Sequence, residues 1–260
     1  LLAPALLMFS ISACAQPAPT APAAKPAVKP AAARPATPAP ARPVPVPAAA
    51  ALPSGPAPRE GTDYVLLPNP QPTWGTGKIE VAEVFSYRCI HCRDFQPLVN
   101  DWKKTMPADV RWEYVPGVFG GTWDTFARAF FTAQLMGIQP QTHDKVFQGV
   151  FVDKAAGEGT VDDIAKMYAK WGVDAAKMTA TMNSFGVTAK LNRAHQFAVR
   201  TGVEGTPTII INGKYRVSVT GDRGFDGMLA TTSYLIAQER AASGMKPAAA
   251  KPAAAPAKKG

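Results

Sequence analysis

Two cysteines separated by two residues, Cys89 and Cys92, constrain this chain more than any other feature. A strand-like apolar run over 79–85 precedes them, and a helical pattern begins at the pair and continues through Trp102. A cysteine at the start of a helix lies at the positive end of the helix dipole, which favours the thiolate and lowers the thiol pKa. The placement indicates a dithiol that exchanges disulfides, since a structural disulfide needs no such position.

Only the middle of the 260-residue chain has the composition of a folded domain. Residues 15–60 and 246–260 are almost entirely Ala and Pro with scattered Lys and Arg, so they lack the apolar side chains that would offset the entropy of ordering. We therefore expect a disordered linker, a disordered tail and one domain over 61–245. The net charge of +9 lies mostly in the two tails. The domain has no basic patch with interleaved aromatics, so nucleic acid is not an expected partner.

The N-terminal residues have the pattern of an export signal. The apolar run 1–11 is too short to span a bilayer and fits the core of a secretory signal. Ile11-Ser12-Ala13-Cys14 follows and resembles a bacterial lipobox, so residues 1–14 are predicted to be a lipoprotein signal, with Cys14 lipidated and tethered to a membrane. The alternative is an ordinary signal peptide cut near Ala15. In both cases the domain is exported to a compartment where disulfides persist.

The apolar periodicity of the domain alternates between strand and helix patterns. Asn212-Gly213 between two apolar runs is a strong hairpin signal. A strand, a helix, a strand, a helical block at about 120–200, a hairpin and a last helix make one α/β unit that is split by an insertion. The expected strands are 79–86, 110–115, 208–213 and 214–219, and the expected helices include 160–172, a short one through Met178, Met182 and Phe185, 187–200 and 225–242.

The run from Glu83 to Cys92, followed by Thr206-Pro207 and Asn212-Gly213-Lys214-Tyr215, resembles the DsbA family of periplasmic thiol:disulfide oxidoreductases. The resemblance covers 61–245 and implies a thioredoxin fold with an inserted helical domain. The preceding strand, the later Thr-Pro and the intervening helices make it more specific than an isolated Cys-x-x-Cys.

The resemblance implies a role for each residue around the pair. Cys89 would be the exposed nucleophile and Cys92 the buried resolving thiol. Thr206-Pro207 would form a cis peptide against the disulfide, and the backbone of Thr206 would pair with an extended substrate. Glu83 would be a buried acid that tunes proton transfer to and from Cys92, the alternative being a half-exposed strand carboxylate.

The two residues inside the motif are Ile90 and His91, where the best-known oxidase of the family has Pro and His. We expect His91 to stabilise the Cys89 thiolate by charge or by hydrogen bonding. The loss of Pro removes a backbone constraint and bears on the oxidising strength. The second strand offers Glu83 no lysine partner.

The implied activity is a thiol:disulfide oxidase that introduces disulfides into reduced, unfolded exported proteins in the bacterial periplasm. By the same resemblance, a DsbB-like quinone-linked membrane protein would re-oxidise it. No metal or organic cofactor is expected, and the domain is expected to be monomeric.

Three other readings of the motif remain open. The same chemistry could run in reverse, as a reductase or isomerase, because its direction depends on redox potential and partner. The chain could instead be a non-catalytic lipoprotein that binds peptides at Thr206-Pro207. A zinc site could combine the cysteine pair with His91, His143 or His195, but the second Cys pair or His-x-x-x-His of such sites is missing. We expect His143 and His195 to be ordinary helix-surface residues.

Overall fold

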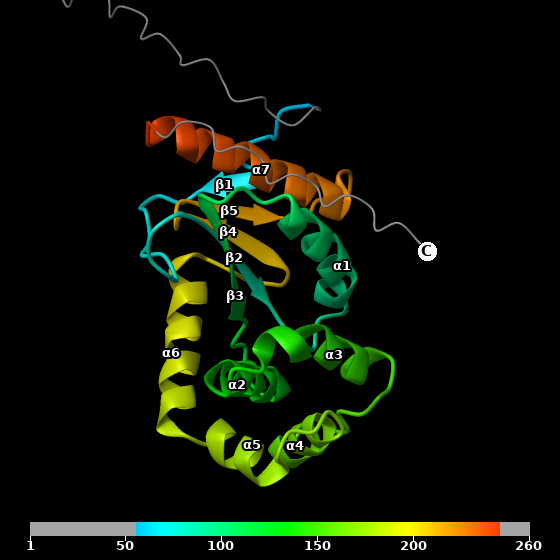
Figure 1. The fold of residues 1–260 in the computed structure, drawn as a ribbon. Helices are drawn as coiled ribbons and strands as arrows, with labels where there is room; N and C mark the ends of the chain where they lie inside the picture. The colour runs from blue at the N-terminus through cyan, green and yellow to red at the C-terminus, as the bar shows by residue number, and fades with distance from the viewer. Residues whose placement is uncertain (1–55, 245–260) are drawn as a thin grey trace, which may run out of the picture. The chain divides into compact units, whose positions relative to one another are not determined.

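A computed structural model describes residues 56–244 of the chain. Its centre is a five-stranded mixed sheet (Figure 1). Strand β2 pairs in parallel with β3 and antiparallel with β4, while β5 lies antiparallel between β4 and β1. The strands are β1 (Tyr64–Leu66), β2 (Ile79–Phe85), β3 (Val110–Pro116), β4 (Thr208–Ile211) and β5 (Tyr215–Ser218), in the order β1-β5-β4-β2-β3.

Two helices belong to the sheet unit, and five others follow β3 and precede β4. The sheet unit contains α1 (Ile90–Lys104) and α7 (Gly224–Ala242). The inserted helices are α2 (Thr122–Leu135), α3 (Gln139–Phe151), α4 (Val161–Ala169), α5 (Ala175–Met182) and α6 (Phe185–Arg200). In Figure 1, α1 and α6 lie on opposite sides of the sheet, and α2 to α5 gather beyond its lower end.

Strand β2 connects two apolar cores. All seven of its residues are buried, as expected for a central strand that is covered on both faces. Ile79 and Val81 join a core with Phe95 of α1 and Met228 of α7. The larger core includes Ala82 and Val84 and continues through Phe126, Phe130, Met178 and Phe197 of the inserted helices. The end of β2 is therefore held from both faces, and the cysteine pair follows it at the start of α1.

The predicted fold class, a thioredoxin fold with a helical insertion, is confirmed. Two local expectations were wrong, and one strand was missed. Phe185 does not belong to the short helix α5, because Ser184 caps the next helix, and Phe185 begins α6 with 87% of its surface exposed. Strand β1 was not predicted. Ordered structure also begins before Gly61, because Arg59 already pairs with Asp63. The predicted signal, Cys14, most of the linker and the tail lie outside the described residues.

Candidate active site at the Cys89–Cys92 pair

The two cysteines lie where β2 ends and α1 begins. Cys89 is the N-cap residue of α1, with an extended backbone (φ −94°, ψ 114°), and its sulfur accepts a hydrogen bond from the Cys92 N–H at 3.4 Å. A sulfur in this position receives the partial positive charge of the helix terminus. Both cysteines are free thiols, so the structure represents the reduced state.

The segment before β4 reaches the same edge of the sheet. Because β4 is antiparallel to β2, its first residue, Thr208, pairs with Val84 near the end of β2. The Thr206–Pro207 peptide bond, just before this strand, is cis. The Cys89 thiol donates a hydrogen bond to the Thr206 carbonyl oxygen at 3.2 Å. Sequence positions more than a hundred residues apart are thus brought together.

The two thiols differ in accessibility. Cys92 has no exposed surface, as expected, whereas Cys89 retains 8%. Cys89 is therefore more enclosed than the expected exposed nucleophile, because the Thr206 loop covers it on one side. Its neighbours Ile90, 39% exposed, and His91 lie at the surface.

The surroundings of Cys89 stabilise its thiolate. Its pKa is lowered to about 5, first by the hydrogen bond from the Cys92 side chain, then by the Thr206 side chain and by the backbone N–H groups of Cys92 and His91, against an opposing effect of burial. The His91 imidazole makes no hydrogen bond within residues 56–244. The contribution of His91 found here comes from its backbone, whereas the expectation placed it in the side chain.

Burial has the opposite effect on Cys92. Desolvation raises its pKa far above the usual range, and the hydrogen bond to Cys89 and the charge of Glu83 act in the same direction. At neutral pH the reduced pair therefore holds one thiolate, on Cys89, and one proton, on Cys92.

Glu83 is the buried acid that the resemblance implies, not a half-exposed strand carboxylate. It is 1% exposed, and its Oε2 atom has no hydrogen-bond partner among the described residues. Desolvation raises the pKa of Glu83 to about 8, while the positive charge of Lys103 partly offsets this increase. The carboxyl group therefore holds a proton at neutral pH and can lose it just above.

Lys103 is a site residue that the sequence analysis missed. We sought a lysine on the second strand, but this one lies on α1, on the same face as Cys92, at the helical spacing 92, 96, 99, 103. Its ammonium group lies 4.8 Å from the centre of the Tyr114 ring, and partial burial lowers its pKa. No salt bridge joins it to Glu83, so its influence on that carboxyl group is through space.

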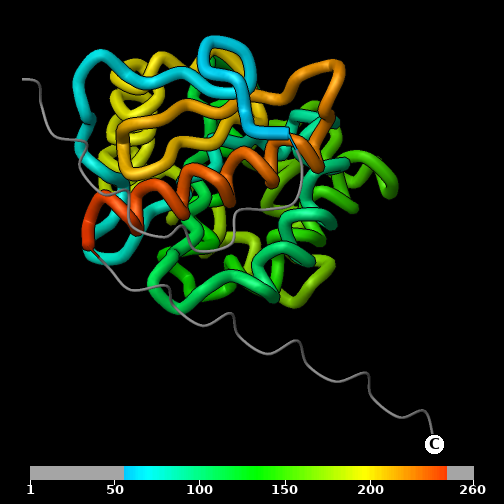
Figure 2. Tube along the Cα trace, turned by 90° about the horizontal axis from the view of Figure 1, so that it is seen from above, coloured from blue at the N-terminus to red at the C-terminus, as the bar shows by residue number. Residues whose placement is uncertain are grey.

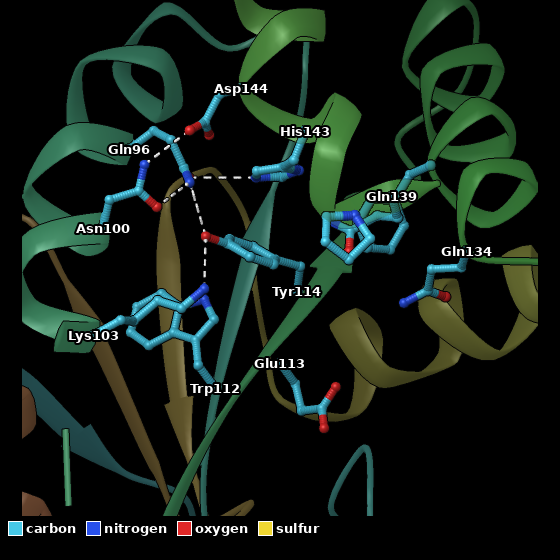
Figure 3. A pocket seen from close by; sticks show the side chains of 12 residues that line it. Gln96, Asn100, Lys103, Trp112, Glu113, Tyr114, Gln134, Gln139, His143 and Asp144 are labelled. Atoms are coloured by element: carbon cyan, nitrogen blue, oxygen red, sulfur yellow. Dashed lines mark hydrogen bonds between the residues drawn. The ribbon is translucent and has the colours of Figure 1, made fainter. Parts of the chain in front are cut away.

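A polar cavity of about 290 Å³ lies beside α1, and its lining includes Lys103, Tyr114 and His143. Figure 3 shows the Gln96 amide between His143 and Tyr114, with Asn100 and Asp144 at the cavity rim. The cavity gives water access to the Lys103 ammonium group.

His143 is not the surface residue we expected. It is 4% exposed, and its Nδ1 and Nε2 atoms lie 2.8 Å from the Tyr87 hydroxyl and 3.3 Å from the Gln96 side-chain oxygen. Burial lowers its pKa to about 3, so the ring is neutral. It ties α3 to α1 and to Tyr87, two residues before Cys89. Sequence reasoning missed this link because it treated the histidine as isolated.

His195 is exposed, as predicted, and its Nδ1 lies 3.3 Å from the Val118 carbonyl oxygen. No group of three or more Cys, His, Asp or Glu side chains with the arrangement of a metal site occurs within the described part of the chain. Both ring nitrogens of His143 have partners away from the cysteines. The zinc alternative thus gains no support from the geometry.

No helix in residues 56–244 is both long and apolar enough to cross a bilayer.

The model of a family described as DSBA-like thioredoxin domain matches residues 115–231, a stretch that begins after the cysteine pair. Longer similarities include the cysteines. The thiol:disulfide interchange protein DsbA of Pseudomonas aeruginosa is 37% identical over 183 residues, which cover 70% of this chain and 86% of that protein. DsbA of Azotobacter vinelandii is 35% identical over 182 residues, with 70% and 85% covered.

Solved structures agree with these sequence similarities. The crystal structure of Pseudomonas aeruginosa DsbA matches with a TM-score of 0.67 at 36% identity and covers 72% of this chain and 96% of that one. The oxidoreductase DsbA from Xylella fastidiosa gives the same TM-score and identity, with 71% and 98% covered. With relatives of this similarity matched over most of their length, and a reduced Cys-x-x-Cys dithiol beside a cis-proline loop, the chain belongs to the DsbA family and is a thiol:disulfide oxidoreductase.

Proposed function

We propose that this enzyme works as an oxidase, which transfers the Cys89–Cys92 disulfide to reduced exported proteins. The observation that carries the proposal is the lowered pKa of Cys89, about 5. A stabilised Cys89 thiolate exists only in the reduced enzyme, so it favours reduction of the enzyme and hence oxidation of the substrate. Glu83, Thr206 and Pro207 complete the site in this proposal.

In the first step, a substrate thiolate attacks the Cys89 sulfur of the oxidised enzyme. The substrate–Cys89 bond forms, the Cys89–Cys92 bond breaks, and Cys92 leaves with the electron pair. Because burial strongly favours the neutral Cys92 thiol, the leaving sulfur must gain a proton. Glu83, protonated at neutral pH, is the group that supplies it.

In the second step, another thiolate of the substrate attacks the substrate sulfur that is bonded to Cys89. A disulfide forms in the substrate, and Cys89 leaves as its stabilised thiolate. Two electrons have passed from the substrate to the enzyme. A DsbB-like membrane protein that passes electrons to a quinone would return the enzyme to the disulfide state.

The Thr206 carbonyl supports the binding of a polypeptide substrate. It lies 3.2 Å from the Cys89 sulfur and accepts a hydrogen bond from it only while Cys89 is a neutral thiol, below about pH 5. Neither the thiolate nor the disulfide has a proton to donate, so at neutral pH this acceptor is free for a backbone N–H of an extended substrate. Periplasmic location, lipidation of Cys14, membrane tethering through residues 15–60 and a monomeric domain belong to the same proposal, supported by the signal-like N-terminal sequence and by the family.

The test is a redox titration of the full chain against glutathione. We expect a potential above that of thioredoxin, with a pH slope of about 60 mV per unit below pH 5 and about 30 mV above it, since Cys89 takes up no proton there. Reduced Cys92→Ser, mixed with a peptide that contains one disulfide, should attack that disulfide through Cys89 and accumulate a mixed disulfide, because no second thiol of the enzyme resolves it, whereas reduced Cys89→Ser should form none. A thioredoxin-like potential would instead assign the enzyme to reduction.

A further inference from the structure

Four charged side chains join the start of the described chain to the loop between β5 and α7. Asp63, 2% exposed, accepts hydrogen bonds from the Arg59 backbone N–H at 2.7 Å and from its guanidinium at 3.0 Å. Arg223 donates to the same carboxylate at 2.9 Å and to the Pro56 carbonyl at 3.3 Å. Arg59 also donates to Asp222 at 2.7 Å. We call Arg59, Asp63, Asp222 and Arg223 the clasp.

Strand pairing explains why the clasp can form. Strand β1 runs antiparallel to β5, with Tyr64 opposite Val217. The residues just before Tyr64 therefore extend past the end of β5, where the loop 219–223 begins. Figure 2 shows the N-terminal segment, in blue, beside the orange turn that leads into α7.

The same loop lies next to the active site. Ser218, the last residue of β5, pairs with Thr208, the first residue of β4. Directly before Thr208 comes the cis-proline loop, and the Thr206 carbonyl contacts Cys89. The loop 219–223 thus borders the side of the cis-proline loop that faces away from β2. Within it, Val219 presents an apolar side chain that is 42% exposed.

The clasp contains three ion pairs, Arg59–Asp63, Arg223–Asp63 and Arg59–Asp222, and they differ in what they can do. The Arg223–Asp63 pair is enclosed, with 17% and 3% of its side chains exposed, so it contributes to the fold. The Arg59–Asp222 pair is 51% and 56% exposed, and such pairs contribute little to global stability. Its effect is local, because it fastens a loop that contains Gly221 to the start of the domain.

We propose that the Arg59–Asp222 pair positions the loop 219–223 as a wall of the site that receives an extended polypeptide beside Cys89. Arg59 and Asp222 are then positioning residues for polypeptide substrates. They do not influence small thiols, which reach the Cys89 sulfur without contacting the loop. The inference rests on the thiol:disulfide exchange activity of the family and not on its direction.

The experiment compares two reduced substrates of the full-length protein, a two-cysteine peptide of about ten residues and dithiothreitol, with glutathione disulfide as the oxidant that regenerates the enzyme disulfide. Asp222→Ala should raise the KM for the peptide about two- to fivefold, the range expected for one exposed ion pair, with kcat and the dithiothreitol rate unchanged. Arg59→Ala should raise the peptide KM at least as much, because it also removes the guanidinium hydrogen bonds to Asp63. The double variant should add no effect beyond that of Arg59→Ala, and Arg59→Lys should restore most of the loss.

Lys104→Ala is the matched control, because it breaks another exposed pair, Lys104–Asp101, at the far end of α1. It should leave both substrates unaffected. The proposal is overturned if peptide KM is unchanged in Asp222→Ala, or if the peptide and dithiothreitol rates fall together. The glutathione redox potential should be the same in all variants, which separates a failure of this inference from a failure of the proposed oxidase function.

Discussion

Glu80 and Glu83 lie three residues apart on β2, both are buried, and their surroundings differ completely. Because side chains alternate along a strand, they point to opposite faces of the sheet. Glu80 accepts hydrogen bonds from the backbone N–H groups of Trp74 and Gly75 at 2.7 and 2.6 Å and forms a salt bridge with Arg111. Glu83 has an oxygen without any partner in residues 56–244, and Lys103, whose charge lowers its pKa, forms no salt bridge with it.

The comparison separates a structural acid from a functional one. Glu80 fixes the segment that leads into β2, since its carboxylate satisfies two backbone donors of that segment. Burial without such partners keeps Glu83 protonated until about pH 8, where it can exchange a proton with Cys92. The number of partners around a buried acid, and not its burial, therefore indicates which one takes part in chemistry.

The largest change in the free energy of unfolding is expected from Glu80→Ala. The substitution leaves the Arg111 guanidinium without its buried counter-ion and two backbone N–H groups without their acceptor. We expect the free energy of unfolding to fall by about 3–5 kcal/mol, measured by urea denaturation of the oxidised protein. The pKa of Cys89, measured by thiolate absorbance on the folded reduced variant, should remain near 5.

Glu158→Ala, at an exposed position, is the control and should change stability by less than about 0.5 kcal/mol. A shift of the Cys89 pKa in Glu80→Ala would show that both acids act on the active site, and the comparison would fail.

Glu83→Gln is expected to raise the free energy of unfolding at neutral pH, whereas Glu80→Ala lowers it. The pKa of Glu83 is raised from 4.5 to about 8 on folding, so its contribution to stability is fully present below pH 4.5 and is lost as the pH rises to 8. Gln does not titrate. In the oxidised state, where neither thiol titrates, the variant should match the parent at pH 4 and exceed its stability at pH 7 by up to about 3 kcal/mol.

The same variant should exchange disulfides more slowly, because the leaving Cys92 loses its proton donor. A rapid-mixing measurement with dithiothreitol between pH 5 and 8 tests this expectation. Equal stability of parent and variant at every pH would mean that the Glu83 carboxyl group has a normal pKa, and its proposed role would be lost.

The sequence was informative where the signal is local. The apolar run before Cys89 and the helical pattern after it correctly predicted β2 and α1, because both patterns reflect burial of adjacent residues. The contrast between Glu80 and Glu83 was not predictable from one strand, since both sit in the same apolar run. Their partners come from the segment before the strand, from β3 and from α1.

The helical periodicity of the sequence does indicate two of the features that the sequence analysis missed, the burial of His143 and the position of Lys103. His143 shares a helix face with Val146, Phe147 and Val150, at the spacing i, i+3, i+4 and i+7, so the periodicity already placed it inside. Lys103 likewise lies on the same helix face as Cys92, at the spacing 92, 96, 99 and 103. Strand β1 had no such signal, because its three residues form a strand only through pairing with β5, far away in the sequence.

Lys103→Met is expected to change stability least of the three variants. It tests most directly why Glu83 differs from Glu80. The positive charge of Lys103 lowers the pKa of Glu83, whereas its own partial burial is unfavourable and lowers the pKa of the ammonium group. Met keeps the length of the side chain without the charge. The pKa of Glu83 should therefore rise above 8 by about half a unit, which corresponds to less than 1 kcal/mol.

The difference in unfolding free energy between Lys103→Met and the double variant Lys103→Met/Glu83→Gln, followed against pH, measures this shift in the pKa of Glu83. Lys104→Met, at the exposed next residue, is the matched control. An unchanged titration of Glu83 would mean that Lys103 does not reach it electrostatically, and desolvation alone would then distinguish Glu83 from Glu80. A loss of stability comparable to that of Glu80→Ala would mean instead that Lys103 and Glu83 form a structural pair like Arg111 and Glu80.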